Sequence, residues 1–171
     1  MNGYSHCMHP AAIPPGDLLK LCDETRTRRS GPGGQHRNKT ETAVILFHGP
    51  TGISAEASER RSQAENRRVA LTRLRLKLAL EHREPASDRP TESWQRRVRG
   101  RQLVIAAGHD DYPVLLAEAL DHLQAARFEI GPVAETLGVT GTQLVRLFRK
   151  CPSAWAALAA CRVSAGLPPL K

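Results

Sequence analysis

The sequence predicts an α+β fold, in which a short sheet packed by one long helix is followed by an all-α, helix-turn-helix-like region. Three observations predict it. Residues 42–47 (TAVILF) are a β-branched and aromatic run of the kind that forms strands. Residues 63–83 contain neither Gly nor Pro and carry apolar side chains at helical spacing. The last 60 or so residues, from about 110 on, hold several further helical patterns separated by Gly and Pro.

The N-terminal elements carry simple boundary signals. Residues 1–12 have neither the basic start nor the apolar run of a signal peptide, so we expect a disordered terminus. Pro14-Pro15-Gly16-Asp17 indicates the start of a short helix, with Asp17 as its cap.

Two more strands flank the β-branched run in sequence. Residues 23–29 alternate between Thr and charged side chains and predict a strand. Pro50-Thr51-Gly52 predicts a turn, and residues 53–58 alternate again. The long helix at 63–83 would then cover the sheet. Its predicted apolar stripe is Val69, Ala70, Leu71, Leu74 and Leu78, and its predicted basic face is Arg67, Arg68, Arg75 and Lys77.

Changes of composition predict the domain boundaries. Pro85 and Pro90 with Ser and Asp between them mark a linker, and the residues up to 101 are basic. We therefore expect a disordered segment at 1–12, a sheet-and-helix domain at 13–84, a basic linker at 85–101, a helical domain at 102–165 and a tail at 166–171.

Residues 133–148 resemble a helix-turn-helix. Ala134, Leu137, Val139 and Leu144 stand where the two helices of that motif pack, Gly138 stands at the turn, and Thr140 is placed to cap the second helix. In a nucleic-acid reader the groove-facing side chains would be Thr142, Gln143, Arg146 and Arg149. An ordinary helical hairpin with a Gly C-cap fits the same residues, and residues 102–171 carry no net charge, which is weak for a DNA-binding protein.

The net charge of +8 is concentrated in two places. Residues 25–39 carry five bases and no acid, and residues 60–101 carry 13 bases against five acids. Most of these bases are Arg, whose planar fork suits phosphate and base stacking, so we expect an RNA partner. No apolar run reaches the ~18 residues of a membrane helix, so no membrane is expected. The four Cys form no CxxC pair, which fits a reducing cytoplasm and argues against a zinc ribbon.

The segment Ser30–Thr40 is the most informative part of the sequence about function. Its adjacent Gly33 and Gly34 remove side chains and allow a backbone to approach a ligand closely. Gln35 is uncharged and a poor base, but it can position a water and offer its backbone N–H to a developing oxyanion. For a lone tripeptide of this kind, a surface loop with basic neighbours is the favoured interpretation.

The tripeptide is accompanied by further motifs. The strings SGPGGQHRNKTE at 30–41, PTGI at 50–53 and RRSQAENRR at 60–68 stand in order. Together they resemble the catalytic domain of class-I peptide chain release factors, over about residues 17–83.

The resemblance implies an activity. In that family the glycine loop enters the peptidyl-transferase centre of the large ribosomal subunit and lets water attack the ester between peptide and tRNA. Gly33, Gly34 and Gln35 match the catalytic positions, and Gln35 matches a residue that a methyltransferase commonly modifies. The partners implied are rRNA and peptidyl-tRNA, with no cofactor and no metal, and we expect a cytoplasmic monomer. The residues expected to contact RNA are Arg28, Arg29, His36, Arg37, Asn38, Lys39, Arg61, Arg67, Arg96 and Arg97.

The sequence also departs from the family. Arg37 stands where the family usually has Val, and only about 16 residues precede the match, so we expect no codon-reading domain. That resembles short proteins that rescue stalled ribosomes without a codon, although the ending GLPPLK differs from their basic tails. Two alternatives stay open: a non-catalytic rRNA- or DNA-binding regulator or assembly factor using the helix-turn-helix-like region, and a stop-codon factor whose partner supplies decoding.

Overall fold

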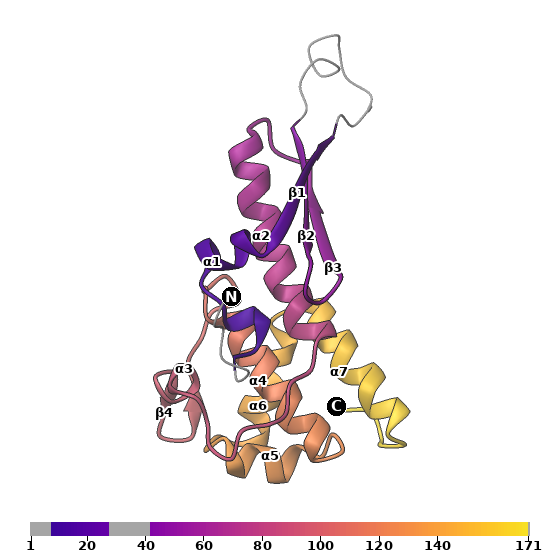
Figure 1. Cartoon of the computed structure of the whole chain (residues 1–171). Helices are drawn as coiled ribbons and strands as arrows, with labels where there is room; N and C mark the ends of the chain where they lie inside the picture. The colour runs from indigo at the N-terminus through magenta and orange to yellow at the C-terminus, as the bar shows by residue number, and fades with distance from the viewer. Residues whose placement is uncertain (1–7, 28–41, 171) are drawn as a thin grey trace. The chain divides into compact units, whose positions relative to one another are not determined.

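The computed structural model describes residues 8–27 and 42–170, which fall into two compact units. The sheet unit is Ile13–Leu78, and the helical unit is Ala79–Lys171 together with Met1–Ala12. Figure 1 labels most of their elements. Within the described ranges, no helix is both long and apolar enough to span a bilayer. The predicted class is confirmed, because a small antiparallel sheet and a long helix precede a mainly helical region.

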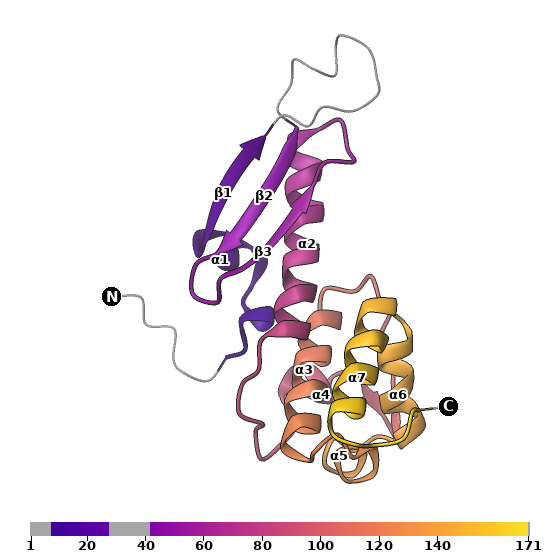
Figure 2. The ribbon, with the colours of Figure 1, turned by 90° about the vertical axis from the view of Figure 1, so that its right-hand side faces the viewer.

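In the part of the sheet unit that the structure describes there are three strands and two helices. Its elements are α1 (Pro15–Lys20), β1 (Cys22–Thr27), β2 (Ala43–His48), β3 (Ile53–Ala57) and α2 (Gln63–Glu81). The strands pair antiparallel in the order β1-β2-β3, and α2 lies along the sheet (Figure 2). The three predicted strands, the turn and the long helix are therefore all present.

Buried and exposed side chains alternate along β2, and this alternation shows which face of the sheet is buried. Val44, Leu46 and His48 are buried, whereas Phe47 between them is exposed. On α2, the fully buried residues Leu74 and Leu78 are four apart and lie on one side of the helix. Burying each such Leu contributes about 1.5–3 kcal/mol, so this layer holds the unit together.

Two predicted details of the sheet unit are wrong. Arg75 is buried rather than on an exposed basic face, because it follows Leu71 by four residues and precedes Leu78 by three, which places it beside the apolar stripe. Asp17 does not cap α1: the N-cap is Pro14, and Asp17 lies in the first turn with its carboxylate 2.8 Å from the Lys20 ammonium.

The helical unit is built around α4. Its elements are the 3-10 helix η1 (Pro10–Ala12), α3 (Glu92–Gln95), β4 (Val98–Arg99), β5 (Gln102–Leu103), α4 (Tyr112–Ala125), α5 (Ile130–Thr136), α6 (Gly141–Arg149) and α7 (Pro152–Ser164). Most of α4 is buried, and it contacts η1, α3, α5 and α6. Helices α4, α5, α6 and α7 all lie in the region from about residue 110 on, for which several helices were predicted.

The segment between the predicted domains is ordered rather than a linker. It contains α3 and β4, and β4 pairs antiparallel with β5 at the start of the predicted helical domain, so the region that follows the sheet is not purely helical. Trp94 is fully buried and its indole Nε1 donates to the carbonyl of Leu137 at 2.8 Å. The Pro residues on either side suggested a linker, but a Trp buried against residues 43 positions away holds this segment in the core.

Residues 8–12 also differ from the expected disordered terminus. Ala11 is fully buried in η1, and η1 contacts α4. The His9 Nε2 bonds the carbonyl of His82 at 3.1 Å, and its Nδ1 accepts from the Ala11 N–H. These contacts tie the terminal segment to residues far along the chain, which local composition does not reveal.

Lowering the pH should weaken this attachment. Burial lowers the pKa of His9 from 6.5 to about 4, so folding favours the neutral ring. The contribution of neutral His9 to the unfolding free energy is complete above pH 6.5 and is lost as the pH falls from 6.5 towards 4. In that range the ring of His9 binds a proton in the unfolded chain but stays neutral in the folded chain. Between pH 7.5 and pH 5 the wild type should lose about 2 kcal/mol of unfolding free energy more than His9→Gln. Urea unfolding at the two pH values measures this, and an equal loss in both proteins would contradict it.

The α5–α6 pair has the packing predicted for it. Ala134, Leu137, Val139 and Leu144 are all buried, and Gly138 has φ +68° at the turn. The Thr140 hydroxyl accepts from the Gln143 N–H and caps α6. A helical hairpin of any function shows the same features, so contact with nucleic acid stays a prediction.

Candidate functional site: the frame of the glycine segment

The sheet brings together the two ends of the segment that carries Gly33-Gly34-Gln35. The last residue of β1, Thr27, pairs with the first residue of β2, Ala43. Paired Cα atoms in an antiparallel ladder lie about 4.5–5.5 Å apart, so the chain leaves the sheet and returns to it at one point. The tripeptide lies outside the described residues, as do six of the predicted RNA contacts: Arg28, Arg29, His36, Arg37, Asn38 and Lys39.

Asn66 lies at the point of return. Its side chain is fully buried, and its Nδ2 donates to the carbonyls of Thr42 at 2.6 Å and Arg60 at 2.9 Å. Its Oδ1 accepts from the Arg60 N–H at 2.9 Å. Figure 2 shows β1 ending, β2 beginning and α2 beginning at the same end of the unit. The helix start, the turn before it and the start of β2 are thus joined through one amide group.

The sequence itself indicates that the Asn66 side chain is buried. Asn66 precedes Ala70 by four residues and Leu74 by eight, so it continues the apolar stripe of α2. A polar side chain in such a stripe must find hydrogen-bond partners inside the protein.

The turn between β2 and β3 is fixed by local hydrogen bonds. The His48 Nδ1 lies 2.8 Å from the Thr51 hydroxyl, and the N–H groups of Thr51 and Gly52 both donate to the His48 carbonyl. Gly52 has φ +72°, which favours glycine at this position. The PTGI motif therefore sets the register of the hairpin, and it stands at the opposite end of β2 from Ala43.

Exposed basic residues of α2 and of the turn before it divide into two groups. Arg67 pairs with Glu24 at 2.7 Å, Arg73 pairs with Glu59 at 2.6 Å, and Lys77 donates to the Ser54 carbonyl at 2.9 Å, so these cations hold α2 to the sheet side of the unit. Arg61 and Arg68 are exposed, and neither pairs with a carboxylate of the described ranges. Of the two RNA contacts predicted here, Arg61 is the more available and Arg67 is already engaged.

The other two predicted RNA contacts lie in the helical unit. The guanidinium of Arg97 bonds the Asp111 carboxylate at 2.5 and 3.0 Å and lies 2.8 Å from the His109 Nε2. The side chain of Arg96 is exposed, and its one partner among residues 8–27 and 42–170 is the carbonyl of Glu92, in the preceding turn. The structure thus gives Arg97 a structural partner and leaves Arg96 open to solvent.

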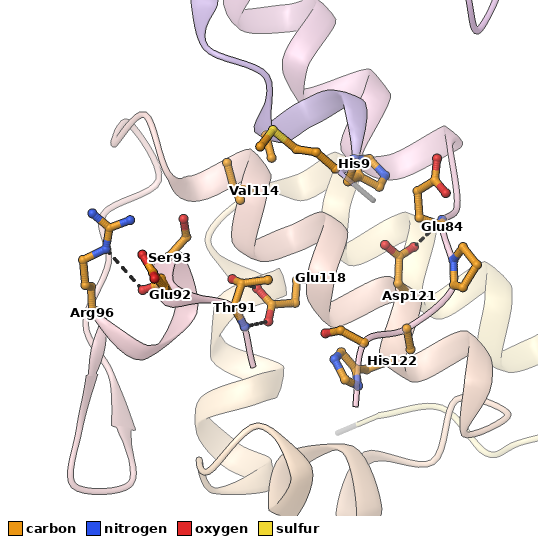
Figure 3. A pocket seen from close by; sticks show the side chains of 15 residues that line it. His9, Glu84, Thr91, Glu92, Ser93, Arg96, Val114, Glu118, Asp121 and His122 are labelled. Carbon is orange, nitrogen blue, oxygen red and sulfur yellow. Dashed lines mark hydrogen bonds between the residues drawn. The ribbon is translucent and has the colours of Figure 1, made fainter. Parts of the chain in front are cut away.

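The helical unit also contains a cavity of about 320 Å³ between α4 and residues 84–96 (Figure 3). The carboxylate of Glu118 accepts from the N–H and hydroxyl of Thr91 at 2.7 and 2.6 Å. Asp121 accepts from the N–H of Glu84 and from the Arg83 guanidinium. These bonds fasten the segment after α2 onto α4, which explains why the two carboxylates are buried.

Burial raises the pKa of both carboxylates. For Asp121 the pKa rises to about 6 because burial outweighs the opposing charge of Arg83, and for Glu118 burial outweighs the bonds from Thr91. Among the described residues, no three His, Cys, Asp or Glu side chains are grouped so that they could hold a metal ion.

Comparison with known proteins links the glycine segment and its frame to one family. Residues 16–107, more than half of the chain, match the RF-1 domain. The chloroplastic peptide chain release factor PrfB1 of Arabidopsis thaliana is 40% identical over 95 residues, which are 51% of this chain and 20% of the relative. The mitochondrial peptide chain release factor 1-like protein of Mus musculus is 49% identical over 57 residues, 33% of this chain and 15% of the relative. Peptide chain release factor 2 of Treponema pallidum is 41% identical over 80 residues, 42% of this chain and 22% of the relative. The matched stretches thus span about a fifth or less of the length of these relatives.

Proposed function

The chain belongs to the RF-1 domain family, and on this premise we propose that it acts as a peptidyl-tRNA hydrolase on the ribosome. The reaction is hydrolysis of the ester that joins the nascent peptide to tRNA, in the peptidyl-transferase centre of the large subunit. Gly33, Gly34 and Gln35 are the proposed catalytic residues. Residues 13–84 are the proposed hydrolase domain.

The pairing of Thr27 with Ala43 is the observation that carries this proposal. A segment meant to reach a distant reaction centre needs a rigid base, and an antiparallel sheet covered by a helix provides one. In sequence the tripeptide lies between Thr27, where β1 ends, and Ala43, where β2 begins. This arrangement supports a role in which the sheet unit delivers the tripeptide to its substrate.

Positioning accounts for most of the proposed catalysis. The backbone N–H of Gln35 would donate to the oxyanion that develops on the ester carbonyl, and its side chain would shape the site of the attacking water. An uncharged amide does not take the proton of that water, so the chain supplies orientation and hydrogen bonding rather than a base. Arg61 and Arg68 are proposed to contact RNA phosphates, because their guanidinium groups are exposed and free of carboxylate partners within the described ranges.

We further propose that this hydrolysis needs no codon in the decoding site. We expect release of a labelled peptide at similar rates from complexes whose decoding site holds a stop codon, a sense codon or no mRNA. Single-turnover release at saturating protein measures this, with buffer alone as the control. Release only on stop codons would contradict codon independence, and no release from any complex would contradict the hydrolase proposal itself.

A further inference from the structure

We propose that Asn66 is a positioning residue for the reaction: its buried amide fixes the chain at Thr42, where the segment bearing Gly33-Gly34-Gln35 returns to the sheet. The inference rests on the proposed hydrolase function. It adds a residue outside the glycine segment, on a different element, to the machinery of that function.

The hydrogen bonds of Asn66 use both hydrogens of its side-chain amide. One Nδ2 hydrogen goes to Thr42 and the other to Arg60, while Oδ1 accepts from Arg60. The side chain therefore pairs with the backbone of Arg60 through both an N–H and a C=O, as a neighbouring strand would. A buried amide bonded in this way holds its partners in one arrangement.

Thr42 needs such a partner because it lies just beyond the strand ladder. The last pair of the ladder is Thr27 with Ala43, and Thr42 precedes it on the side of the glycine segment. The bond from Asn66 is 2.6 Å long and comes from a side chain with no solvent exposure. It holds Thr42, which is seven residues from Gln35 in sequence.

Asparagine is the side chain that this geometry requires. Asp has the same shape but no hydrogen to donate, so it would face the carbonyls of Thr42 and Arg60 with a carboxylate oxygen. Leu would fill the space and leave both carbonyls without a partner. We expect either change to leave the backbone at Thr42 less precisely positioned. A small misplacement of a reacting group costs up to about a hundredfold in rate.

The test compares Asn66→Asp with Leu74→Ala in the full chain. Leu74 is a fully buried residue of the same helix, eight residues further on, so its truncation lowers stability without touching Thr42. Both variants are assayed with the wild type and Gln35→Ala at a temperature where circular dichroism shows all four folded. Asn66→Ser, which leaves room for a water at the Thr42 carbonyl, replaces Asn66→Asp if the latter does not fold.

We expect Asn66→Asp to slow release at saturating protein by about tenfold to a hundredfold, with an unchanged half-saturating concentration. Leu74→Ala should release at close to the wild-type rate. In hydrogen exchange, peptides containing Thr42 should lose protection in Asn66→Asp and keep it in Leu74→Ala.

The outcomes separate the two proposals. Equal release by the wild type and Gln35→Ala would overturn the proposed function. Slow release by Gln35→Ala together with wild-type release by Asn66→Asp would overturn only the positioning role. That role would also be overturned if Leu74→Ala slowed release as much as Asn66→Asp, since a general loss of stability would then explain both.

Discussion

Gln35→Ala should reduce peptide release by about a hundredfold to a thousandfold, which is the range seen when one oxyanion-stabilising donor or its geometry is lost. The Ala backbone still carries an N–H, so the loss would come from the missing side chain at the water site and from a less ordered backbone. Gly34→Ala should act at least as strongly, because a Cβ would stand where the backbone is expected to approach the substrate. Binding to the ribosome should change little in either variant, since neither removes a charge.

Release and binding must be measured separately to test this. Single-turnover release at saturating protein gives the rate, and co-sedimentation with stalled complexes gives the affinity. Gln102→Ala changes an exposed Gln in the helical unit and is the matched control. Unchanged release in both Gln35→Ala and Gly34→Ala would rule out catalysis by the tripeptide.

Trp94→Ala should lower the unfolding free energy of the helical unit by about 3–5 kcal/mol. The indole is fully buried, so truncation leaves a large cavity, and the hydrogen bond to the Leu137 carbonyl is lost with it. Trp94→Phe keeps most of the apolar contact and loses the hydrogen bond, so about 1–3 kcal/mol is expected.

The second Trp of the chain provides the control. Trp155 is half-buried and contacts the Arg149 guanidinium over its ring at 5.0 Å, so Trp155→Ala should cost clearly less than Trp94→Ala. Urea unfolding followed by far-ultraviolet circular dichroism compares the variants without relying on Trp fluorescence. Equal losses for the two truncations would show that residues 92–95 do not contribute to the core.

Local pattern was sufficient for much of the fold. The β-branched run that became β2 and the Gly- and Pro-free stretch that became α2 each have a composition that favours one type of element. Thr140 caps α6 through a hydrogen bond within one turn, which is why the sequence revealed it. Each of these features is decided by residues that are close together in the chain.

The features that the sequence missed depend on distant contacts. His9 bonds residue 82, and Trp94 bonds Leu137, so neither the ordered N-terminal residues nor the packed segment around α3 follows from local composition. Pro85 and Pro90 pointed to a linker, because Pro breaks helices whether or not the chain around it is packed. Burial of Arg75 likewise depends on how far the covered face of α2 extends.

The candidate site was recognised from sequence only in part. Gly33, Gly34 and Gln35 are identified by their order among other motifs, which needs no structure. The place of Asn66 in the apolar stripe of α2 predicts that its amide is bonded inside the protein, but it does not identify Thr42 and Arg60 as the partners. The catalytic peptide can therefore be recognised from sequence, whereas the contacts that hold it come from the structure.

The position of Gln35 on the ribosome tests the central claim most directly. Cryo-electron microscopy of the full chain on a stalled complex with a non-hydrolysable peptidyl-tRNA measures the distance from the Gln35 backbone nitrogen to the ester carbonyl oxygen. The account predicts that this distance is about 3 Å, within hydrogen-bond range, with the sheet unit bound to the large subunit. A chain bound to the ribosome with Gln35 far from the ester would contradict it.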